Sequence, residues 1–231
     1  MYKEKTYREL IELVSIHKKL TFQSQLDLNE ELNKRNIQDD IVDLENTIKE
    51  KISKIENLDY LNNLGFKADK FGDSIRVTRT DKAVLIDIIA IVLGIIFCLI
   101  GLFGIFGLIG SFSSESEFSI LSLITTIGMI AIGILGIKFL SGIKRLIDYA
   151  GFELLNNNGT ITLKKRFDTK LVEIQKNESL LELKEQSELV TLKLENDDIL
   201  SANTNNIIQK MTISELTKRL KLLPTPCIKH S

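Results

Sequence analysis

Two long apolar stretches are the strongest pattern along the chain. Residues 88–109 and 118–137 contain no charged side chain, and each is about as long as a helix that crosses a hydrocarbon core of roughly 30 Å. Residues 110–117 link the two stretches and are polar and acidic. Because so short a link returns the chain across the membrane, the pattern predicts a transmembrane hairpin with both flanking regions on one side.

Basic residues flank the hairpin at both of its outer ends but are missing from its link. Cytoplasmic flanks of membrane helices carry an excess of Lys and Arg, so this distribution predicts that both termini lie in the cytoplasm. The flanking cations are Arg76, Arg79 and Lys82 before the first stretch, and Lys138, Lys144 and Arg145 after the second.

Apolar residues at steps of three and four predict cytosolic helices within residues 1–64. A polar stretch at 29–36 separates two such stripes and is expected to turn the chain. Two arrangements bury both stripes: a helical hairpin within one chain, or a coiled coil between subunits. The first stripe holds Tyr7, Leu10, Ile11, Val14 and Ile16 to Leu20, and the second holds Ile37, Ile41, Leu44, Ile48, Ile52, Ile55 and Leu58.

A short internal repeat flanks the hairpin, at residues 65–79 and 151–165. Each copy opens with a Gly-Phe pair, continues through a turn rich in Gly, Asn or Asp, and closes with an alternating strand that ends in cations. Glycine suits the left-handed position that ends a helix, and both copies follow a helical run with an Asp-Tyr pair. The repeat predicts a β-hairpin at 65–82 and one sheet, beside the inner membrane face, that holds strands of both copies.

Alternating apolar and polar residues between 160 and 195 predict an antiparallel meander with one buried and one solvated face, within a cytosolic β domain at 148–200. Thr212 and Glu215 fit a capping box, which predicts a final amphipathic helix within residues 201–231. That helix either lies on the membrane surface or packs on the meander. The alternating apolar residues are Ile161, Leu163, Val172, Ile174, Leu181, Leu183, Val190, Leu192 and Leu194.

These patterns predict a membrane α+β protein with a two-helix transmembrane hairpin at 83–147, N-terminal cytosolic helices and a small cytosolic antiparallel β meander. The 30 basic and 31 acidic residues nearly cancel, which argues against binding to a nucleic-acid duplex. The chain has only two histidines and two cysteines, and it lacks metal-ligand spacing, a phosphate-binding loop and a nucleophile motif. We therefore expect no catalytic residue, no metal, no cofactor and no enzymatic activity.

Glycines mark both apolar stretches, and those of the first recur at every third position. Small residues let helix backbones approach closely where no hydrophobic effect acts between helices. Two helices share a limited surface, and glycines spaced by three drift around a helix. We therefore expect homo-oligomerisation, with packing inside one hairpin as the alternative. These glycines are Gly101, Gly104, Gly107, Gly110, Gly128, Gly133 and Gly136.

Polar side chains within the hairpin are few. Ser119, Ser122 and Thr126 fall on one side of the second stretch, where they either line a narrow pore or hydrogen-bond across an interface or to their own backbone. No charged ring lies at mid-membrane, so strong ion selectivity is not encoded there. Asp87 and Lys138 are expected at the same depth, which predicts an interfacial ion pair that sets the register of the hairpin.

Basic residues near the inner face have two interpretations. Most follow from the positive-inside rule, but they are also candidates to bind anionic lipid headgroups or a phosphorylated cytosolic ligand. The cations at 164–166 fit the first interpretation least, because they lie beyond the first strand of the meander. The full set is Arg76, Arg79, Lys144, Arg145, Lys164, Lys165 and Arg166.

The hairpin at 88–137 followed by the meander at 160–195 resembles, in architecture, prokaryotic antiphage membrane effectors with two transmembrane helices and a small cytosolic β domain. The resemblance implies a homo-oligomer of the bacterial cytoplasmic (inner) membrane that senses a cytosolic ligand or protein and alters membrane permeability, as an ion channel does, in antiviral defence. The competing hypothesis is a non-conducting membrane-anchored scaffold that recruits cytosolic partners. Either way, the lipid bilayer is an expected partner.

Overall fold

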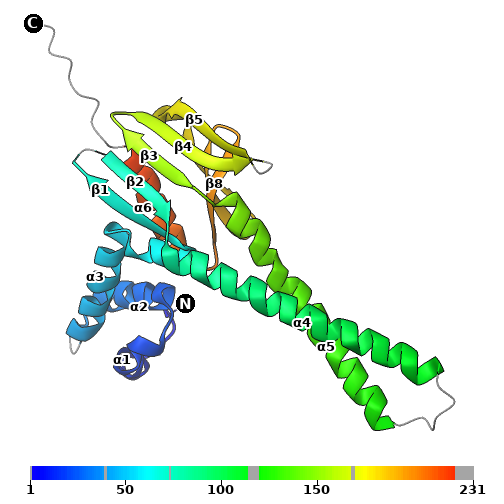
Figure 1. Ribbon diagram of the computed structural model, residues 1–231. Coiled ribbons are helices and arrows are strands. Elements are labelled where there is room, and N and C mark those ends of the chain that lie inside the picture. The colour runs from blue at the N-terminus through cyan, green and yellow to red at the C-terminus, as the bar shows by residue number, and fades with distance from the viewer. Residues whose placement is uncertain (1, 39–40, 73, 114–119, 168–169, 222–231) are drawn as a thin grey trace, which may run out of the picture. The chain divides into compact units, whose positions relative to one another are not determined.

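The computed structural model describes residues 2–38, 41–72, 74–113, 120–167 and 170–221 (Figure 1). Contacts divide the chain into two units, and each is described by itself. Unit 1 comprises Met1–Val77, Leu155–Ile161 and Gln175–Ser231, and unit 2 comprises Thr78–Leu154 and Thr162–Ile174.

Three α-helices open unit 1, one more than a helical hairpin requires. They are α1 (Tyr7–Ser15), α2 (Phe22–Lys34) and α3 (Val42–Glu56). The expected turn at 29–36 is wrong for most of its length, because α2 continues to Lys34 and the chain turns at Asn36, whose φ is 55°. A surface helix needs only one apolar face, so the polar residues at 29–34 do not interrupt it.

Capping side chains start the first two helices, and one core buries both apolar stripes. Thr6 forms a capping box with Glu9, whose Oε2 accepts the Thr6 N–H at 2.7 Å. The hydroxyl of Thr21 accepts the Ser24 N–H at 3.2 Å at the start of α2. Leu28 and Leu32 of α2 belong to the same core. Packing within the chain therefore buries much of both stripes, including Leu10, Val14, Ile37, Ile41, Leu44, Ile48 and Ile55.

The strands of the described residues form two sheets, so the single meander expected at 160–195 is wrong. A polar break at the 3₁₀ turn η3 (Glu178–Leu180) separates them. Alternation reports which face of a strand is buried, but not which strand lies beside it. The five-stranded sheet has the order β1 (Phe66–Phe71), β2 (Ser74–Arg79), β3 (Glu153–Asn157), β4 (Thr160–Phe167), β5 (Lys170–Asn177). The three-stranded antiparallel sheet has the order β6 (Leu181–Gln186), β7 (Leu189–Leu194), β8 (Asp197–Asn203).

Strand β8 lies beyond the alternating region and was not expected. Ile199 and Leu200 are adjacent residues of β8, and both are buried. This breaks the two-residue period of a strand with one buried face. A register shift opposite them, between Leu192 and Lys193, lets two consecutive side chains reach the core.

The internal repeat is visible in the backbone. Strands of both copies belong to the five-stranded sheet, as the repeat predicts. Gly65, the first residue of the first copy, ends the 3₁₀ helix η2 (Asp59–Leu64) and has φ of 84°. Gly151, the first residue of the second copy, has φ of 77°. Both are left-handed positions that a side chain would strain, so the two copies share their turn chemistry.

Helix α6 (Ile207–Lys221) begins before the predicted capping box. Asn206 is the residue that caps it, accepting the Gln209 N–H at 3.3 Å. Thr212 instead donates its hydroxyl to Ile208 O at 2.7 Å, and Glu215 pairs with Arg219 at 2.7 Å. The predicted start is wrong because Thr and Glu three residues apart also fit a helix interior, where each bonds along the helix.

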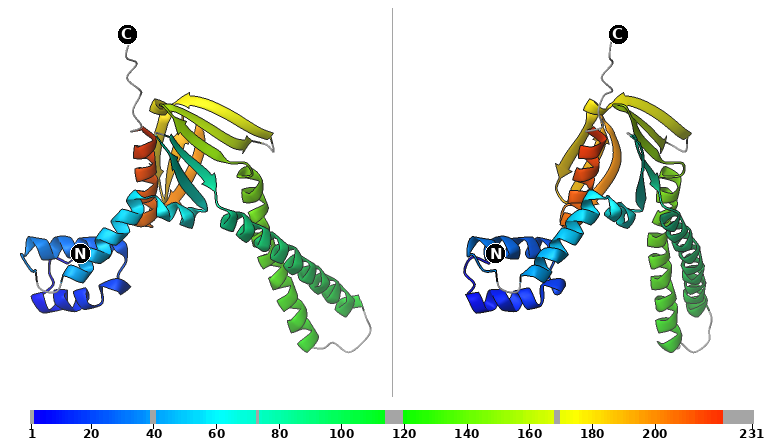
Figure 2. Two further views of the ribbon diagram at one scale, coloured as in Figure 1. Left: turned by 60° about the vertical axis from the view of Figure 1, so that its left-hand side comes forward. Right: turned by 90° about the vertical axis from the view of Figure 1, so that its left-hand side faces the viewer.

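The apolar side of α6 packs against one face of the three-stranded sheet (Figure 2). Ile213, Leu216 and Leu220 are fully buried there. Lys210 Nζ lies 2.7 Å from Glu185 Oε2 and links the helix to β6. Of the two alternatives for this helix, packing on the sheet is therefore the observed one.

Asn156 joins the β3–β4 turn to the end of α6 and is fully buried. Its Oδ1 accepts the Gly159 N–H at 3.2 Å, and its Nδ2 donates to Leu220 O and, at 3.2 Å, to Glu178 Oε2. An Asn156→Ala variant leaves these groups without their partner and is expected to lose about 2–4 kcal/mol of unfolding free energy.

Denaturation followed by circular dichroism measures the loss, with Asn157→Ala as the control, since Asn157 is exposed. Equal destabilisation by both substitutions would contradict a structural role that is specific to Asn156.

Helices α4 (Asp81–Ser113) and α5 (Ile120–Asp148) lie side by side and make up most of unit 2 (Figures 1 and 2). The expected link at 110–117 is in part helical, because α4 continues to Ser113. Both helices are long and apolar enough to cross a membrane, and only 11% and 17% of their most apolar windows is buried within the chain. A core helix of a soluble protein is mostly buried, so this exposed apolar surface is typical of helices that face lipid.

Candidate functional site

Glycines bring α4 and α5 into close backbone contact. A Cβ on Gly101 would lie 2.6 Å from Gly133 Cα, and a Cβ on Gly136 would lie 2.8 Å from the backbone N of Cys98. At Gly104 the closest atom, Met129 Cβ, would lie at 2.9 Å. Real side chains do not approach so closely, so these four glycines serve packing inside the hairpin, the alternative to oligomerisation.

The other expected packing glycines are not required by the hairpin. A Cβ on Gly107 would make only ordinary contacts, the closest at 3.6 Å, and one on Gly110 or Gly128 would meet no atom within 4 Å. A contact with a second copy remains a prediction that rests on Gly110 and Gly128.

Two more glycines at the interface were missed. A Cβ on Gly94 would lie 2.9 Å from Leu140 Cδ2, and one on Gly142 would lie 3.4 Å from Asp87 O. Gly94 precedes Gly101 by two helical turns on the same face, and that spacing is the signal from which it was predictable.

The predicted hydroxyl stripe of Ser119, Ser122 and Thr126 does not line one common surface in the described residues. Thr126 is buried beside α4 and donates its hydroxyl to Ser122 O of its own helix at 2.7 Å. Ser122 is exposed, and Ser119 lies outside the described residues. Bonding to the backbone one turn earlier is thus the observed role of Thr126.

Asp87 does not pair with Lys138, so that prediction is wrong. Arg79 donates a hydrogen bond to Asp87 Oδ2, and Arg145 Nη2 lies 3.2 Å from Asp87 Oδ1. The Asp87 side chain is only 4% exposed, whereas Lys138 is exposed on α5. The packing of the hairpin places Gly142, about one turn beyond Lys138, next to the Asp87 backbone, so Arg145 rather than Lys138 reaches Asp87.

Tyr149 adds an aromatic ring beside this ion pair. The guanidinium carbon of Arg79 lies 5.1 Å from the ring centroid, and Lys165 Nζ lies 5.6 Å from it. Phe152 packs edge-on against the same ring, with centroids 5.6 Å apart. Cations at these distances are attracted to the electron-rich face of an aromatic ring. We call Arg79, Asp87, Arg145, Tyr149 and Lys165 the basal cluster.

A cavity of about 370 Å³ opens beside the basal cluster, and we call it the basal cavity. Thr78 Oγ1 is buried there and has no hydrogen-bond partner among the described residues. The cavity is lined by Thr78, Arg79, Val84, Leu146, Tyr149, Ala150, Gly151 and Phe152, which all belong to unit 2.

The other expected cations have different roles. Lys164 Nζ lies 3.4 Å from Glu153 and 3.6 Å from Glu173, and the hydrogen bond and charge of Glu153 raise the pKa of Lys164. Arg166 Nε donates to Ala150 O at 3.3 Å. Lys144 is exposed on α5, and Arg76 is exposed in unit 1. Of the predicted set, the basal cluster contains Arg79, Arg145 and Lys165.

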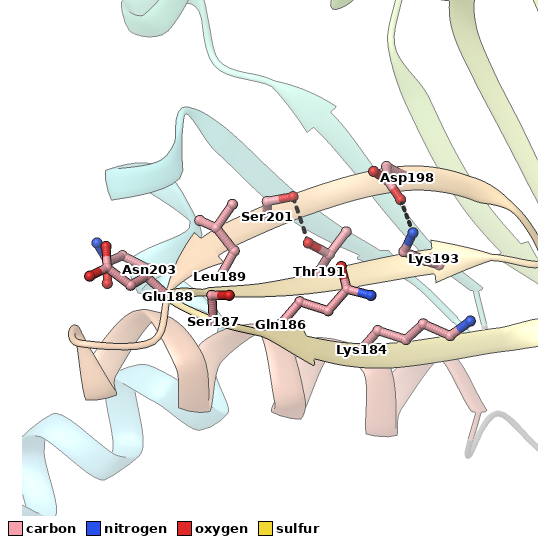
Figure 3. Close-up of a pocket in the computed structure, with 10 residues that line it drawn as sticks. All are labelled: Lys184, Gln186, Ser187, Glu188, Leu189, Thr191, Lys193, Asp198, Ser201 and Asn203. Carbon is pink, nitrogen blue, oxygen red and sulfur yellow. Dashed lines mark hydrogen bonds and ion pairs between the residues drawn. The ribbon is translucent and has the colours of Figure 1, made fainter.

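A second candidate surface lies on the open face of the three-stranded sheet, opposite α6 (Figure 3). Polar side chains from all three strands line a hollow of about 650 Å³. Lys193 lies 2.7 Å from Asp198, and the hydroxyls of Thr191 and Ser201 lie 3.0 Å apart. Thr191 and Lys193 belong to the polar half of the predicted alternation, whereas Asp198 and Ser201 come from β8. The hollow is lined by Lys184, Gln186, Ser187, Glu188, Leu189, Thr191, Lys193, Asp198, Ser201 and Asn203.

Within the described part of the chain, no group of three or more His, Cys, Asp or Glu side chains is placed to hold a metal ion. The basal cluster places cations beside a partly apolar cavity, an arrangement suited to charge recognition. Comparison with known proteins finds no matching family model, no matching curated protein and no matching solved structure.

Proposed function

We propose that this protein is a membrane-anchored scaffold: its hairpin holds it in the bacterial cytoplasmic membrane, and its cytosolic helices and sheets bind a protein partner. The observation that supports an anchor best is the packing of the hairpin on itself, with Gly101 against Gly133 and apolar side chains directed outward. Such a hairpin needs no further helix to satisfy its backbone or to pack the glycines at its close contact. The excess of cations at its outer ends supports cytoplasmic termini.

The polar groups of the hairpin also support an anchor rather than a pore. The Thr126 hydroxyl donates its hydrogen bond to Ser122 O of the same helix. The buried Asp87 is paired with Arg79 and Arg145 at one end of the hairpin. A selective pore requires polar or charged groups that face an aqueous path. The open face of β6–β8 offers a partner both charges and several hydroxyl and amide groups (Figure 3).

Membrane fractionation and membrane potential test this proposal in bacteria that express the full-length protein. An anchored scaffold is expected to stay in the membrane after an alkaline carbonate wash and to leave the potential, read with a voltage-sensitive dye, unchanged. Release by the wash would contradict the anchor, and depolarisation would contradict the non-conducting role.

One observation favours a second candidate function, a homo-oligomeric effector that alters membrane permeability in antiviral defence. An apolar groove of about 260 Å³ lies on the hairpin surface, lined by residues that include Cys98, Leu102, Ile130 and Ile134. It offers a place for side chains of a second copy, and Gly128 faces open space on α5. Depolarisation by the wild type that Gly128→Leu abolishes, at equal protein level in the membrane, would support this effector.

A further inference from the structure

The basal cavity lies at the end of a hairpin that is longer than a hydrocarbon core. Helix α4 has 33 residues, which at about 1.5 Å per residue is about 50 Å, whereas a bilayer with its headgroups measures about 40–45 Å. Arg79 stands just before α4 begins, and Tyr149 stands just after α5 ends. Asp87 directly precedes the uncharged stretch 88–109 and binds the Arg79 guanidinium, whose carbon lies 5.1 Å from the Tyr149 ring centroid. In an anchored hairpin these side chains therefore lie at headgroup depth.

The walls of the basal cavity divide into an apolar part and a polar part. Val84, Leu146 and Phe152 supply apolar side chains, whereas Arg79, Tyr149 and Thr78 supply polar ones. The buried Thr78 hydroxyl still has a hydrogen bond to give. A fully soluble anion leaves the apolar walls without a partner, so the lining fits an amphipathic molecule better.

The charges around the basal cavity favour an anion. Asp87 is one carboxylate against two guanidinium groups, those of Arg79 and Arg145. Lys165 adds a further positive charge at the Tyr149 ring, on the side of the sheet. Arg79, Arg145 and Lys165 thus place three cationic groups around Asp87 and the Tyr149 ring, at the depth where a lipid phosphate lies. Guanidinium and ammonium groups form strong, charge-assisted hydrogen bonds with phosphate oxygens.

We propose that the basal cavity binds an anionic glycerophospholipid of the cytoplasmic leaflet. Arg79 and Lys165 bind the phosphate, the Thr78 hydroxyl donates to a phosphate or ester oxygen, and Val84, Leu146 and Phe152 contact the glycerol and the first acyl carbons. The site rests on the proposed anchoring, because only an anchored hairpin holds the cavity at headgroup depth. Bound lipid joins α4, α5 and β4 at one point and so couples the hairpin to the sheet.

Native mass spectrometry of the detergent-purified full-length protein tests the site directly. We expect phosphatidylglycerol to bind more tightly than phosphatidylcholine, whose headgroup has no net charge. Lys165→Gln is expected to weaken phosphatidylglycerol binding about fivefold, the effect of about one interfacial cation. Lys144→Gln is the matched control, because it removes an exposed cation of α5 that lies outside the basal cluster, and it is expected to change binding less than twofold.

A second variant tests the cavity without changing any charge. Val84→Phe fills part of the apolar wall and is expected to weaken phosphatidylglycerol binding while leaving the protein folded by circular dichroism. Equal binding of both lipids, or equal losses from Lys165→Gln and Lys144→Gln, would overturn the site. Displacement of phosphatidylglycerol by soluble glycerol 3-phosphate at similar concentration would assign the cavity to a soluble phosphate ester and overturn the lipid.

The lipid site and the membrane anchor can be contradicted by different measurements. Binding in detergent needs no insertion, so loss of the protein from washed membranes would contradict the anchor whatever the mass spectra show. Retention in the membrane together with no preference for phosphatidylglycerol would overturn the lipid site alone.

Discussion

Replacing Gly101 with leucine is expected to separate α4 from α5. The new Cβ alone would lie 2.6 Å from Gly133 Cα, so the helices must move apart along their whole contact. Because backbone atoms cannot yield as a side chain can, the cost is expected at or above the upper end of overpacking, about 3 kcal/mol. The natural thiol Cys98, which lies at this contact near Gly133 O, reports the opening through its rate of alkylation in detergent.

A Cys227→Ser background leaves Cys98 as the single thiol, since the chain has two cysteines. Gly128→Leu is the matched control on the same hairpin, because a Cβ there meets no atom within 4 Å. We expect faster alkylation in Gly101→Leu and an unchanged rate in Gly128→Leu. Equal rates in all three proteins would show that the close contact does not hold the hairpin together.

Replacing Asp87 with asparagine is expected to have the second large effect. The substitution removes the carboxylate that Arg79 and Arg145 share, and the Arg79 side chain beside it is only 11% exposed. Removing one partner of a buried ion pair costs about 3–5 kcal/mol, because the other charge stays desolvated. Unfolding by titration with sodium dodecyl sulfate, followed by circular dichroism, measures the change.

Two control variants distinguish the observed pairing of Asp87 with Arg79 and Arg145 from the predicted pairing with Lys138. Asp81→Asn removes an exposed carboxylate from the first turn of the same helix, and Lys138→Gln removes the cation once expected opposite Asp87. Both are expected to change the unfolding free energy by less than about 1 kcal/mol. A loss in Lys138→Gln as large as that in Asp87→Asn would contradict the observed pairing.

Patterns confined to one segment predicted the two apolar helices and the two Gly-Phe turns, but not the turn after α2 or the start of α6. An uncharged run long enough to cross a bilayer identifies an apolar helix without reference to the rest of the chain, and α4 and α5 contain both predicted runs within the described residues. The Gly-Phe repeats likewise located Gly65 and Gly151, since a left-handed residue at a helix end is a local requirement. Even so, Thr212 shows the limit of a local motif, because the same spacing occurs inside a helix.

The basal cluster was predictable only as a list of cations. Arg79, Arg145 and Lys165 stood among the candidate ligands for an anion, but nothing in their spacing distinguished them from Arg76, Lys144 or Lys164. Tyr149, the residue that Arg79 and Lys165 share, was seen only as part of a repeat. Side chains from β2, α5 and β4 meet there because of the way the strands and helices are connected, and that juxtaposition has no sequence period.

By itself, the sequence determined two apolar helices joined as a hairpin, a set of N-terminal helices and an antiparallel α+β layout, because hydrophobic period and turn chemistry act over a few residues. The tertiary structure alone decided which residues meet: Arg79 and Arg145 with Asp87, Gly101 with Gly133, and β8 with β7 in a second sheet. The physical reason is that partners depend on how helices rotate about their axes and on which sheet a strand joins. Those choices are settled by packing between segments far apart in the chain.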